Sequence, residues 1–581
     1  MAYRKFYLPV YSSSKQLEGV LFLNRNQNSH FATLPSVDIG RSTFDRSHSV
    51  KTSFNVGDVV PFYIDEVLPG DTFDVDTSRV VRMQSLLTPV MDNIYLDSYF
   101  FFVPNRLVWS HWRELNGENT ESAWIPQTEY TVPQITSPAD GGWDVGTIAD
   151  YFGIPTGVSG LSVNAMPFRA YALIMNEWFR DENLTDPLDI PVSDATVAGT
   201  NGDNYITDVA KGGKPFKAAK YRDYFTSALP SPQKGPDVTL PIVGSVNYPV
   251  VARAEHIPDS LKPYQPISLV SSGGIVPTDQ NLVIKRYGNA SSGYESVLAG
   301  NGTATGSGDY NPVSINNLWA VSGGDVPVAS INQLRMAFQI QKLYERDARG
   351  GTRYIEILKS HFGVTSPDAR LQRPEYLGGN RVPITINQVL QQSATQADGT
   401  PQGTPVGMSL TTDRNSDFKK SFVEHGFLIG VMVARYDHTY QQGLERLWSR
   451  KDRFDYYWPV FANIGEQAIY NKEIFAQGTS ADDEVFGYQE AWADYRYKSN
   501  RVSGEMRSSY PQSLDVWHLA DDYSALPSLS DSWIREDSSN VNRVLAFSEQ
   551  NANQLFADIY IRNRCTRPMP MYSVPGLIDH H

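Results

Sequence analysis

The sequence of 581 residues has very little cysteine and no excess of positive charge. Its single cysteine, Cys565, cannot form a disulfide within the chain, which argues against a disulfide-stabilised secreted protein and favours a reducing compartment. Lysine and arginine number 50 against 64 aspartate and glutamate residues, so the formal net charge is −14. The chain as a whole is therefore not a basic nucleic-acid-binding protein. Any DNA contact needs a local basic face or a separate basic partner.

Long hydrophobic runs are also missing. The longest apolar stretch, residues 427–434, is interrupted by Gly430 and is far too short to cross a bilayer. The first ten residues contain no apolar run long enough for a signal peptide. We therefore expect a soluble protein with no membrane insertion.

Glycine and proline, by contrast, are plentiful, with 43 and 36 residues spread along the whole length. Such regular punctuation is typical of many short strands joined by turns and not of a helical bundle. Hydrophobic residues make up 41% of the chain, which is enough for a sizeable core. The composition therefore favours a mainly β protein.

Strand patterns begin at Val59. Residues 59–83 contain two β-rich runs around the turn Pro69-Gly70-Asp71. In residues 94–103 large apolar side chains occur on both alternating faces, which predicts a strand that is covered on both sides. Strand patterns return in the last third, around residues 425–440 and 555–570.

Helical spacing occurs in three segments, residues 167–180, 331–346 and 353–362. The first has Pro167 near its first turn, and Gly350-Gly351 separates the other two. Residues 11–58 are polar and rich in turn formers. Residues 236–325 are rich in glycine, serine, asparagine and threonine, a pattern that indicates either a surface-exposed folded insertion or a disordered linker.

These patterns divide the chain into four parts. We expect an extended N-terminal arm at 1–58 and the first part of a β core, with inserted loops, at 59–235. A surface insertion follows at 236–329, and the second part of the core, with helices and a C-terminal tail, at 330–581. Strands at both ends with long insertions between them are typical of a jelly roll whose loops have grown.

Motifs for catalysis or cofactor binding are absent: there is no HExxH, Walker-type phosphate loop, GxGxxG before a helix, or CxxC. Three acidic groups, Asp65-Glu66, Asp71 to Asp76 and Asp482-Asp483-Glu484, are best explained as solvated turn and strand-end carboxylates. A glycosidase carboxylate pair or a calcium site is the other explanation for them. We expect no enzyme activity, no cofactor and no metal. The alternative is a β-sandwich carbohydrate-active enzyme or carbohydrate-binding module, for which 32 tyrosines and 11 tryptophans could line sugar sites.

Basic residues gather weakly at both ends of the chain. Arg4 and Lys5 lie beside aromatic residues, and Arg562, Arg564 and Arg567 lie close together. Basic groups among aromatic rings suit single-stranded nucleic acid, because bases stack on rings while phosphates pair with cations. These five residues are candidates for DNA contact, although surface charge or ion pairs between subunits explain them equally well.

Four blocks of sequence carry a resemblance to a known family. They are FNVGDVVPFYIDEVLPGDTFDVDTSRVVRMQSLLTPVMDNIYLDSYFFFVPNRLVW (54–109), DYFTSALPSPQKG (223–235), LRMAFQIQKLYERDARGGTRYIEILKSHFGV (334–364) and CTRPMPMYSVPGLIDHH (565–581). In order and content they resemble the major capsid proteins of the Microviridae, in particular the gokushovirus branch. Residues 236–329 match nothing in that pattern.

The resemblance implies a mainly β, eight-stranded viral jelly roll with long inserted loops and a few helices. It implies a T=1 icosahedral shell of sixty copies, built through five-, three- and two-fold contacts around a circular single-stranded DNA genome. It also implies a small basic DNA-binding protein, an internal scaffolding protein and a DNA pilot protein as partners, assembly in the host bacterial cytoplasm, and a place in the virion.

In the family that this chain resembles, the unmatched segment forms protrusions on the particle surface. We therefore expect residues 236–329 to meet a host surface receptor. The candidate receptor-facing residues are Lys285, Arg286, Tyr287, Tyr294 and Tyr310.

Overall fold

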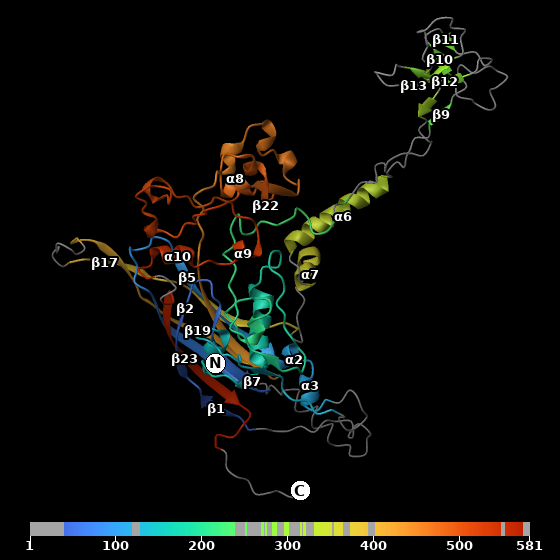
Figure 1. Cartoon of the computed structure of the whole chain (residues 1–581). Helices are drawn as coiled ribbons and strands as arrows, with labels where there is room; N and C mark the ends of the chain where they lie inside the picture. The colour runs from blue at the N-terminus through green and yellow to red at the C-terminus, as the bar shows by residue number, and fades with distance from the viewer. Residues whose placement is uncertain are drawn as a thin grey trace, which may run out of the picture. The chain divides into compact units, whose positions relative to one another are not determined.

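The computed structural model divides the chain into two compact units, one of Met1–Pro232 with Thr365–His581 and the other of Gln233–Val364. Figure 1 follows the chain from blue at the N-terminal end to red at the C-terminal end. The structure describes residues 40–118, 128–236, 238, 331–350, 354–363, 372–392, 401–547 and 552–572, with the short strands β9 to β15 between 250 and 320.

Two antiparallel sheets form the centre of the first unit (Figure 1). The first sheet has the order β1 and β2, β23, β4, β19, with bounds Ser42–Asp45, His48–Phe54, Leu555–Arg567, Thr72–Met83 and Thr411–Ser421. The second has the order β16, β5, β20, β3, with bounds Glu375–Pro383, Ile94–Pro104, Gly426–Tyr436 and Val60–Val67. β1 and β2 pair with opposite ends of β23, so they act as one interrupted edge strand.

The chain passes back and forth between the two sheets, except from β5 to β16, which both belong to the second sheet. From β2 the chain crosses to β3, returns to β4 and crosses again to β5, and it repeats the exchange through β16, β19, β20 and β23. This connectivity is that of a jelly roll. The prediction of a mainly β jelly roll with a few helices is therefore confirmed. In the described part of the chain the two sheets form an open sandwich and do not close into a barrel.

One hydrophobic core lies between the inner faces of the sheets. Phe73 and Ile559 of the first sheet and Phe100 and Leu428 of the second are all fully buried in it. Each of them faces the same side of its sheet as every second residue of its strand, as the period of two requires. Gly430 pairs with Phe100 in the neighbouring strand, and a Cβ at this position would lie 2.8 Å from the Phe100 ring. The glycine therefore gives that ring its space.

A second core covers the outer face of β5 and β20. Phe101 and Val103 of β5 pack there with helix α5 (Met166–Ile174), which continues as a π-helical turn, η2 (Met175–Phe179). The helix predicted at 167–180 is confirmed, and so is a β5 covered on both sides. Tyr171 ties the helix to the sheet, because its hydroxyl donates to the Val59 carbonyl at 2.5 Å.

The expectation of an unpacked arm as far as residue 58 is wrong for its last part. Residues 42–45 and 48–54 form β1 and β2, and Phe54 is fully buried. An edge strand with one face toward solvent contains few apolar residues, so its sequence resembles that of a loop. Residues 1–39 lie outside the described residues.

The remaining elements of the first unit are short and belong to its inserted loops. Helices are α2 (Asn105–Val108), α3 (Trp112–Leu115), α4 (Ile148–Tyr151), α8 (Asn471–Ile474), α9 (Asp531–Ile534) and α10 (Ser539–Val544). Strands are β6 (Gln134–Thr136), β7 (Ser162–Asn164), β8 (Val197–Ala198), β17 (Ile386–Leu390), β18 (Pro405–Ser409), β21 (Glu466–Tyr470) and β22 (Val485–Glu490). The 3₁₀ turns are η3 (Val209–Lys211), η5 (Arg446–Ser449), η6 (Arg453–Asp455), η7 (Pro459–Phe461), η8 (Ser480–Asp483), η9 (Ala493–Tyr495), η10 (Gly504–Met506) and η11 (Asp515–Trp517).

The second unit contains helices α6 (Ile331–Gly350) and α7 (Tyr354–Phe362), as predicted for 331–346 and 353–362. The sequence grouped these helices with the β core, whereas they cluster with the preceding segment. Its described strands are β9 (Val250–Ala252), β10 (Leu269–Ser271), β11 (Gly274–Ile275), β12 (Leu282–Tyr287), β13 (Glu295–Gly300), β14 (Ser314–Ile315) and β15 (Leu318–Ala320). Across the described residues of both units, no helix is long and apolar enough to span a membrane.

Candidate assembly and nucleic-acid surfaces

The predicted DNA-facing arginines of β23 do not form one basic surface. Arg562 and Arg564 lie on the outward face of the first sheet, where Arg562 forms ion pairs with Asp76 and, at 3.9 Å, with Asp74. Arg564 is exposed on the same face. Arg567 is bound elsewhere, with its Nε 3.0 Å from Asp71 and its Nη2 donating to the Glu66 carbonyl at 2.5 Å. Arg567 therefore fixes the turn between β3 and β4.

Opposite charges alternate across the outward face of the first sheet. Lys51 lies 3.3 Å from Asp558 on the neighbouring strand, and Lys419 lies 3.4 Å from Asp74. Charges that pair across strands give a solvated face of mixed sign. DNA contact by Arg562 and Arg564 remains a prediction. Arg4 and Lys5 lie outside the described residues.

Three of the candidate receptor residues lie on one strand. Lys285, Arg286 and Tyr287 are the last residues of β12, where they pair with Val297, Ser296 and Glu295 of β13. Tyr294 and Tyr310 lie outside the described residues. The structure thus places these three on a hairpin of the second unit, and their role in attachment remains a prediction.

A dense group of exposed apolar side chains lies in residues 444–464, between β20 and β21, which we name the aromatic segment. Its large apolar side chains with more than a third of their surface exposed are Leu444, Leu447, Trp448, Phe454, Tyr456, Tyr457, Trp458, Val460 and Ile464. The exposed fraction reaches 69% for Trp448 and 87% for Val460. Single exposed apolar residues are ordinary, but such a concentration is typical of surfaces that contact another molecule.

Ring contacts hold the aromatic segment in a fixed shape. The Tyr457 ring lies 5.7 Å from Trp492 and 6.2 Å from Tyr495, between centroids, and the Trp492 indole donates to the Phe461 carbonyl at 2.9 Å. Trp492 has a φ of +63° and is, among the described residues, the single non-glycine with a positive φ. Left-handed backbone costs about 1–2 kcal/mol for such a residue. The packing around Trp492 must offset that cost, which indicates a preformed surface.

Guanidinium groups lie among these rings. Arg450 lies 4.2 Å from the Tyr495 centroid and forms an ion pair with Asp494, and Arg453 lies 4.7 Å from the Trp458 centroid. Arginine, tryptophan and tyrosine are the residues that most often dominate the energetics of protein interfaces. The side chains of the aromatic segment are therefore of the kind that a tight subunit contact uses.

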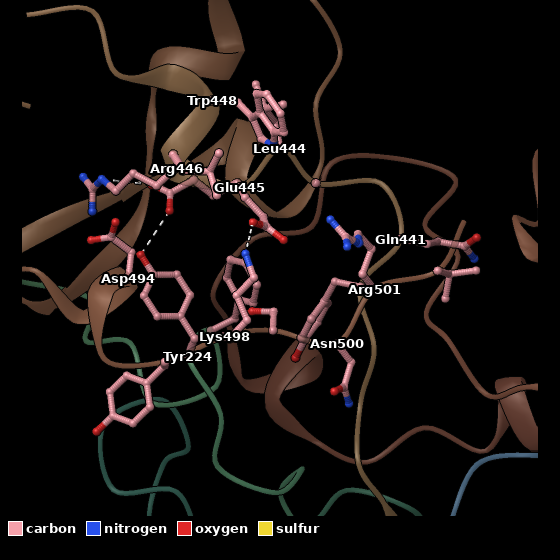
Figure 2. A pocket seen from close by; sticks show the side chains of 18 of the residues that line it. Tyr224, Gln441, Leu444, Glu445, Arg446, Trp448, Asp494, Lys498, Asn500 and Arg501 are labelled. Atoms are coloured by element: carbon pink, nitrogen blue, oxygen red, sulfur yellow. Dashed lines mark hydrogen bonds and ion pairs between the residues drawn. The ribbon is translucent and has the colours of Figure 1, made fainter. Parts of the chain in front are cut away.

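A pocket of about 540 Å³ adjoins the aromatic segment (Figure 2). The ion pair between Glu445 and Lys498 lies in the middle of this view. Arg446 lies 3.9 Å from Glu473, which also accepts a hydrogen bond from Tyr224 at 3.0 Å. Burial raises the pKa of Glu473, although the charge of Arg446 opposes the rise. Glu445, Glu473 and Asp494 of this pocket are thus paired with cations or, for Glu473, also with a phenol.

The acidic groups noted in the sequence also have structural partners. Asp71 binds Arg567, Asp76 binds Arg562, and Asp483 binds Lys472 at 2.6 Å. Asp482 accepts backbone hydrogen bonds at 2.9 and 2.7 Å in the preceding turn. Over the described ranges, no three histidine, cysteine, aspartate or glutamate side chains are grouped so that they could hold a metal ion.

Comparison with known proteins identifies the family. Residues 32–577 match the family described as capsid protein (F protein). The capsid protein VP1 of Spiroplasma virus 4 is 43% identical over 550 residues, which cover 94% of this chain and 97% of that protein. The capsid proteins VP1 of Bdellovibrio phage phiMH2K and Chlamydia phage 1 are each 42% identical; the matches cover 95% and 94% of this chain and 99% and 97% of theirs. The chain belongs to the phage capsid protein (F protein) family.

The resemblance to Microviridae capsid proteins is thereby confirmed. A member of the F-protein family is a structural subunit of the virion and not an enzyme, so the carbohydrate-active alternative is discarded. Sequence reasoning missed the aromatic segment. Its composition is visible in the sequence, but the exposure of its side chains is a property of the folded loops.

Proposed function

We propose that this chain is the major subunit of a T=1 icosahedral shell, in which sixty copies meet at five-, three- and two-fold contacts. The exposed aromatic segment is the observation that supports a contact with a second copy. The jelly roll gives each subunit a rigid wedge shape, and closed symmetry repeats each contact around the shell. Rings that are half exposed in one subunit become buried in a neighbour, and the apolar area removed from water drives association.

Electron cryomicroscopy of the purified protein tests the shell. Uniform isometric particles with icosahedral symmetry and sixty subunits support the proposal. A monodisperse monomer at every concentration and ionic strength contradicts it.

Two almost fully exposed valines test whether the aromatic segment makes the contact. Val460 in the segment and Val423 at the turn before β20 are 87% and 89% exposed, so aspartate at either position should leave the subunit folded. Val460→Asp should abolish particles, because it would place an unpaired charge in a buried contact. Val423→Asp should leave them intact. Equal particle yields for both variants, with circular dichroism showing that both fold, would remove the segment from the interface.

The proposed cargo is a circular single-stranded DNA genome. The net charge of −14 supports a separate small basic DNA-binding protein that neutralises phosphates inside the shell. An internal scaffolding protein and a DNA pilot protein complete the proposed partners, with assembly in the host bacterial cytoplasm. Nuclease-treated particles should release single-stranded DNA together with the basic protein. Release of duplex DNA or RNA, or of no nucleic acid, contradicts this part.

The insertion at 236–329, with Lys285, Arg286, Tyr287, Tyr294 and Tyr310, is the proposed host-attachment site. Its support is its glycine- and serine-rich composition and its membership of a separate compact unit. Deletion of residues 240–325 should leave particles that no longer adsorb to cells. Normal adsorption and infection by such particles would exclude the role.

A further inference from the structure

A second pocket, of about 500 Å³, lies on the outer face of the β16-β5-β20-β3 sheet within the first unit. One wall consists of side chains from three neighbouring strands: Tyr99 and Phe101 of β5, Tyr376 and Arg381 of β16, and Arg435 of β20. The other wall consists of Trp178 and Phe179 of η2, the following residues Arg180 and Asp181, and residues 219–222. Its size is that of a site for one small organic ligand.

Aromatic rings form one side of this pocket. Phe101, Trp178 and Tyr376 pack on one another with centroids 5.5 to 6.0 Å apart. Trp178 and Tyr376 nevertheless remain 40% and 44% exposed. The Trp178 indole donates to the Pro374 carbonyl at 3.0 Å, which fixes the orientation of the ring. The Arg373 guanidinium lies over the Trp178 ring, 5.0 Å from its centroid, so the pocket offers positioned ring surface that is only partly uncovered and has a cation beside it.

Cations outnumber carboxylates around the pocket. Asp97 is buried between Arg381, whose Nε lies 2.7 Å away, and Arg435, whose Nη2 lies 2.6 Å away. Burial alone would raise the pKa of Asp97, but hydrogen bonds and charge from the two guanidinium groups outweigh it and lower the pKa. One carboxylate thus faces two guanidinium groups. Arg180 adds a further positive charge, and its Nη1 donates to the Thr185 carbonyl at 2.9 Å.

The carboxylate oxygens beside the pocket are already occupied. Asp97 also accepts from the hydroxyls of Tyr221 at 2.8 Å and Tyr99 at 3.1 Å. Asp181 accepts from Arg222 at 2.5 Å and from two backbone N–H groups at 2.9 and 3.0 Å. The pocket therefore presents donors and positive charge with few acceptors. A neutral sugar needs both donors and acceptors, whereas an anion with a flat ring is matched on both walls.

We propose that this pocket binds one nucleotide of single-stranded nucleic acid, with the base against Trp178 and Tyr376 and the phosphate facing Arg180 and Arg381. The proposal rests on the proposed function in one respect, that the chain meets a single-stranded genome. Proteins bind single strands without sequence preference by stacking bases on aromatic rings and pairing phosphates with cations.

Fluorescence anisotropy with two probes separates stacking from charge. One probe is a labelled ten-residue oligothymidylate, and the other is an abasic sugar-phosphate oligomer of equal length. The full-length chain should bind the thymidylate on the order of tenfold more tightly than the abasic oligomer. Trp178→Leu should abolish that difference, and Trp178→Phe should retain most of it. Equal affinity for both probes, or an unchanged preference in Trp178→Leu, overturns the proposal.

The phosphate contact has its own readout. Arg180→Gln should reduce the slope of log K against log salt by about 0.7, the value for one phosphate contact with a single strand. The matched control is Arg113→Gln, on helix α3, where the arginine pairs with Glu118 at 3.2 Å on the surface. Equal slopes for the two variants, with thermal unfolding showing that both fold, contradict the assignment of Arg180.

Failure of the pocket and failure of the proposed function give different results. If particles contain single-stranded DNA but Trp178→Leu changes neither probe, the pocket assignment is wrong and the capsid function stands. If the chain binds the thymidylate through Trp178 but particles contain no DNA, the genome proposal fails and the pocket stands. Loss of particles in Trp178→Leu with no thymidylate binding by the unaltered chain would instead assign the pocket to a segment of a second copy.

Discussion

The central strands of the two sheets, β20 and β23, differ in how far their outer faces are buried. In β20 nearly every residue is buried, because the sandwich core covers one face and helix α5 with its loops covers the other. In β23 buried and exposed residues alternate along most of the strand, because its outer face is open. β20 is thus an interior strand of a single subunit, whereas β23 retains an open face of paired charges. The subunit itself covers both faces of β20 and leaves the outer face of β23 open to other molecules.

The largest expected effect comes from placing a charge on the outer face of each sheet. Val431 of β20 is fully buried in the second core, so Val431→Asp should lower the free energy of unfolding by about 4 kcal/mol or more and prevent folding. Tyr560 of β23 is 50% exposed, so Tyr560→Asp should change it by less than about 1 kcal/mol. Soluble yield and urea unfolding followed by circular dichroism measure both. Similar losses of unfolding free energy for the two variants would show that the outer faces of β20 and β23 do not differ in burial.

Loss of an aromatic ring should affect the two strands differently. Phe100 is fully buried and packs edge-on against Phe62 at 5.4 Å and Tyr63 at 5.8 Å, so Phe100→Ala should cost about 3–5 kcal/mol of unfolding free energy. Phe556, on the open face of β23, is 43% exposed, and Phe556→Ala should cost less than about 1 kcal/mol. Urea midpoints compare the two, and a costly Phe556→Ala in the unassembled subunit would show that the open face is covered.

Charge buried near the end of β20 should make stability depend on pH. His438 is buried, with Nδ1 2.9 Å from Asp521 and Nε2 2.9 Å from Glu536. Burial alone would lower the pKa of His438, but the two carboxylates outweigh it and raise the pKa to about 9. Because the folded pKa exceeds the unfolded value of about 6.5, the stabilisation is complete below pH 6.5 and disappears as the pH rises through 9.

Unfolding free energy measured between pH 6 and 10 should therefore fall by on the order of 3 kcal/mol in the unaltered chain. His438→Gln should be less stable at pH 6 and should lack most of this dependence. The control is His48→Gln on the exposed edge strand β2, which should preserve the pH profile. An unchanged profile in His438→Gln would mean that another group titrates.

The smallest expected effect concerns an ion pair on the open face. Arg562 is a third exposed where it meets Asp76, so Arg562→Gln should cost less than about 1 kcal/mol, and added salt should reduce the cost. Thermal unfolding at low and high ionic strength measures it. A cost that is large and independent of salt would mean that this pair is shielded from solvent, unlike the rest of the open face.

The parts of the fold that were predictable from the sequence depend on local pattern. β5 has apolar residues in both alternating sets, and the turn before β4 contains Gly70, whose φ of +93° favours glycine. The helices at 166–179, 331–350 and 354–362 have local spacing too. β1 and β2 were missed because their evidence is a partner about 500 residues away, and no local pattern reports such a pairing.

The surfaces were less predictable than the fold. Arg567 was grouped with Arg562 and Arg564 by proximity in sequence, but its guanidinium turns to Asp71. The cluster around Asp97 joins Arg381, Arg435 and Tyr221 from segments far apart in sequence. Burial and pairing of such groups follow from the tertiary fold, which brings distant residues together, and not from the spacing of residues along the chain.

The position of β23 has a consequence for how the protein is made. The last strand of the jelly roll to be synthesised is an interior strand, which lies between β2 and β4. Residues 42–54 therefore cannot pair within their sheet until residues 555–567 have been synthesised. Such long-range closure is slow and leaves strand edges unpaired in the meantime. A chain whose synthesis stops early lacks the middle of a sheet and not merely its border. Incomplete translation products should therefore fail to fold and should not be incorporated into a shell. The topology of the fold thus favours assembly from complete subunits.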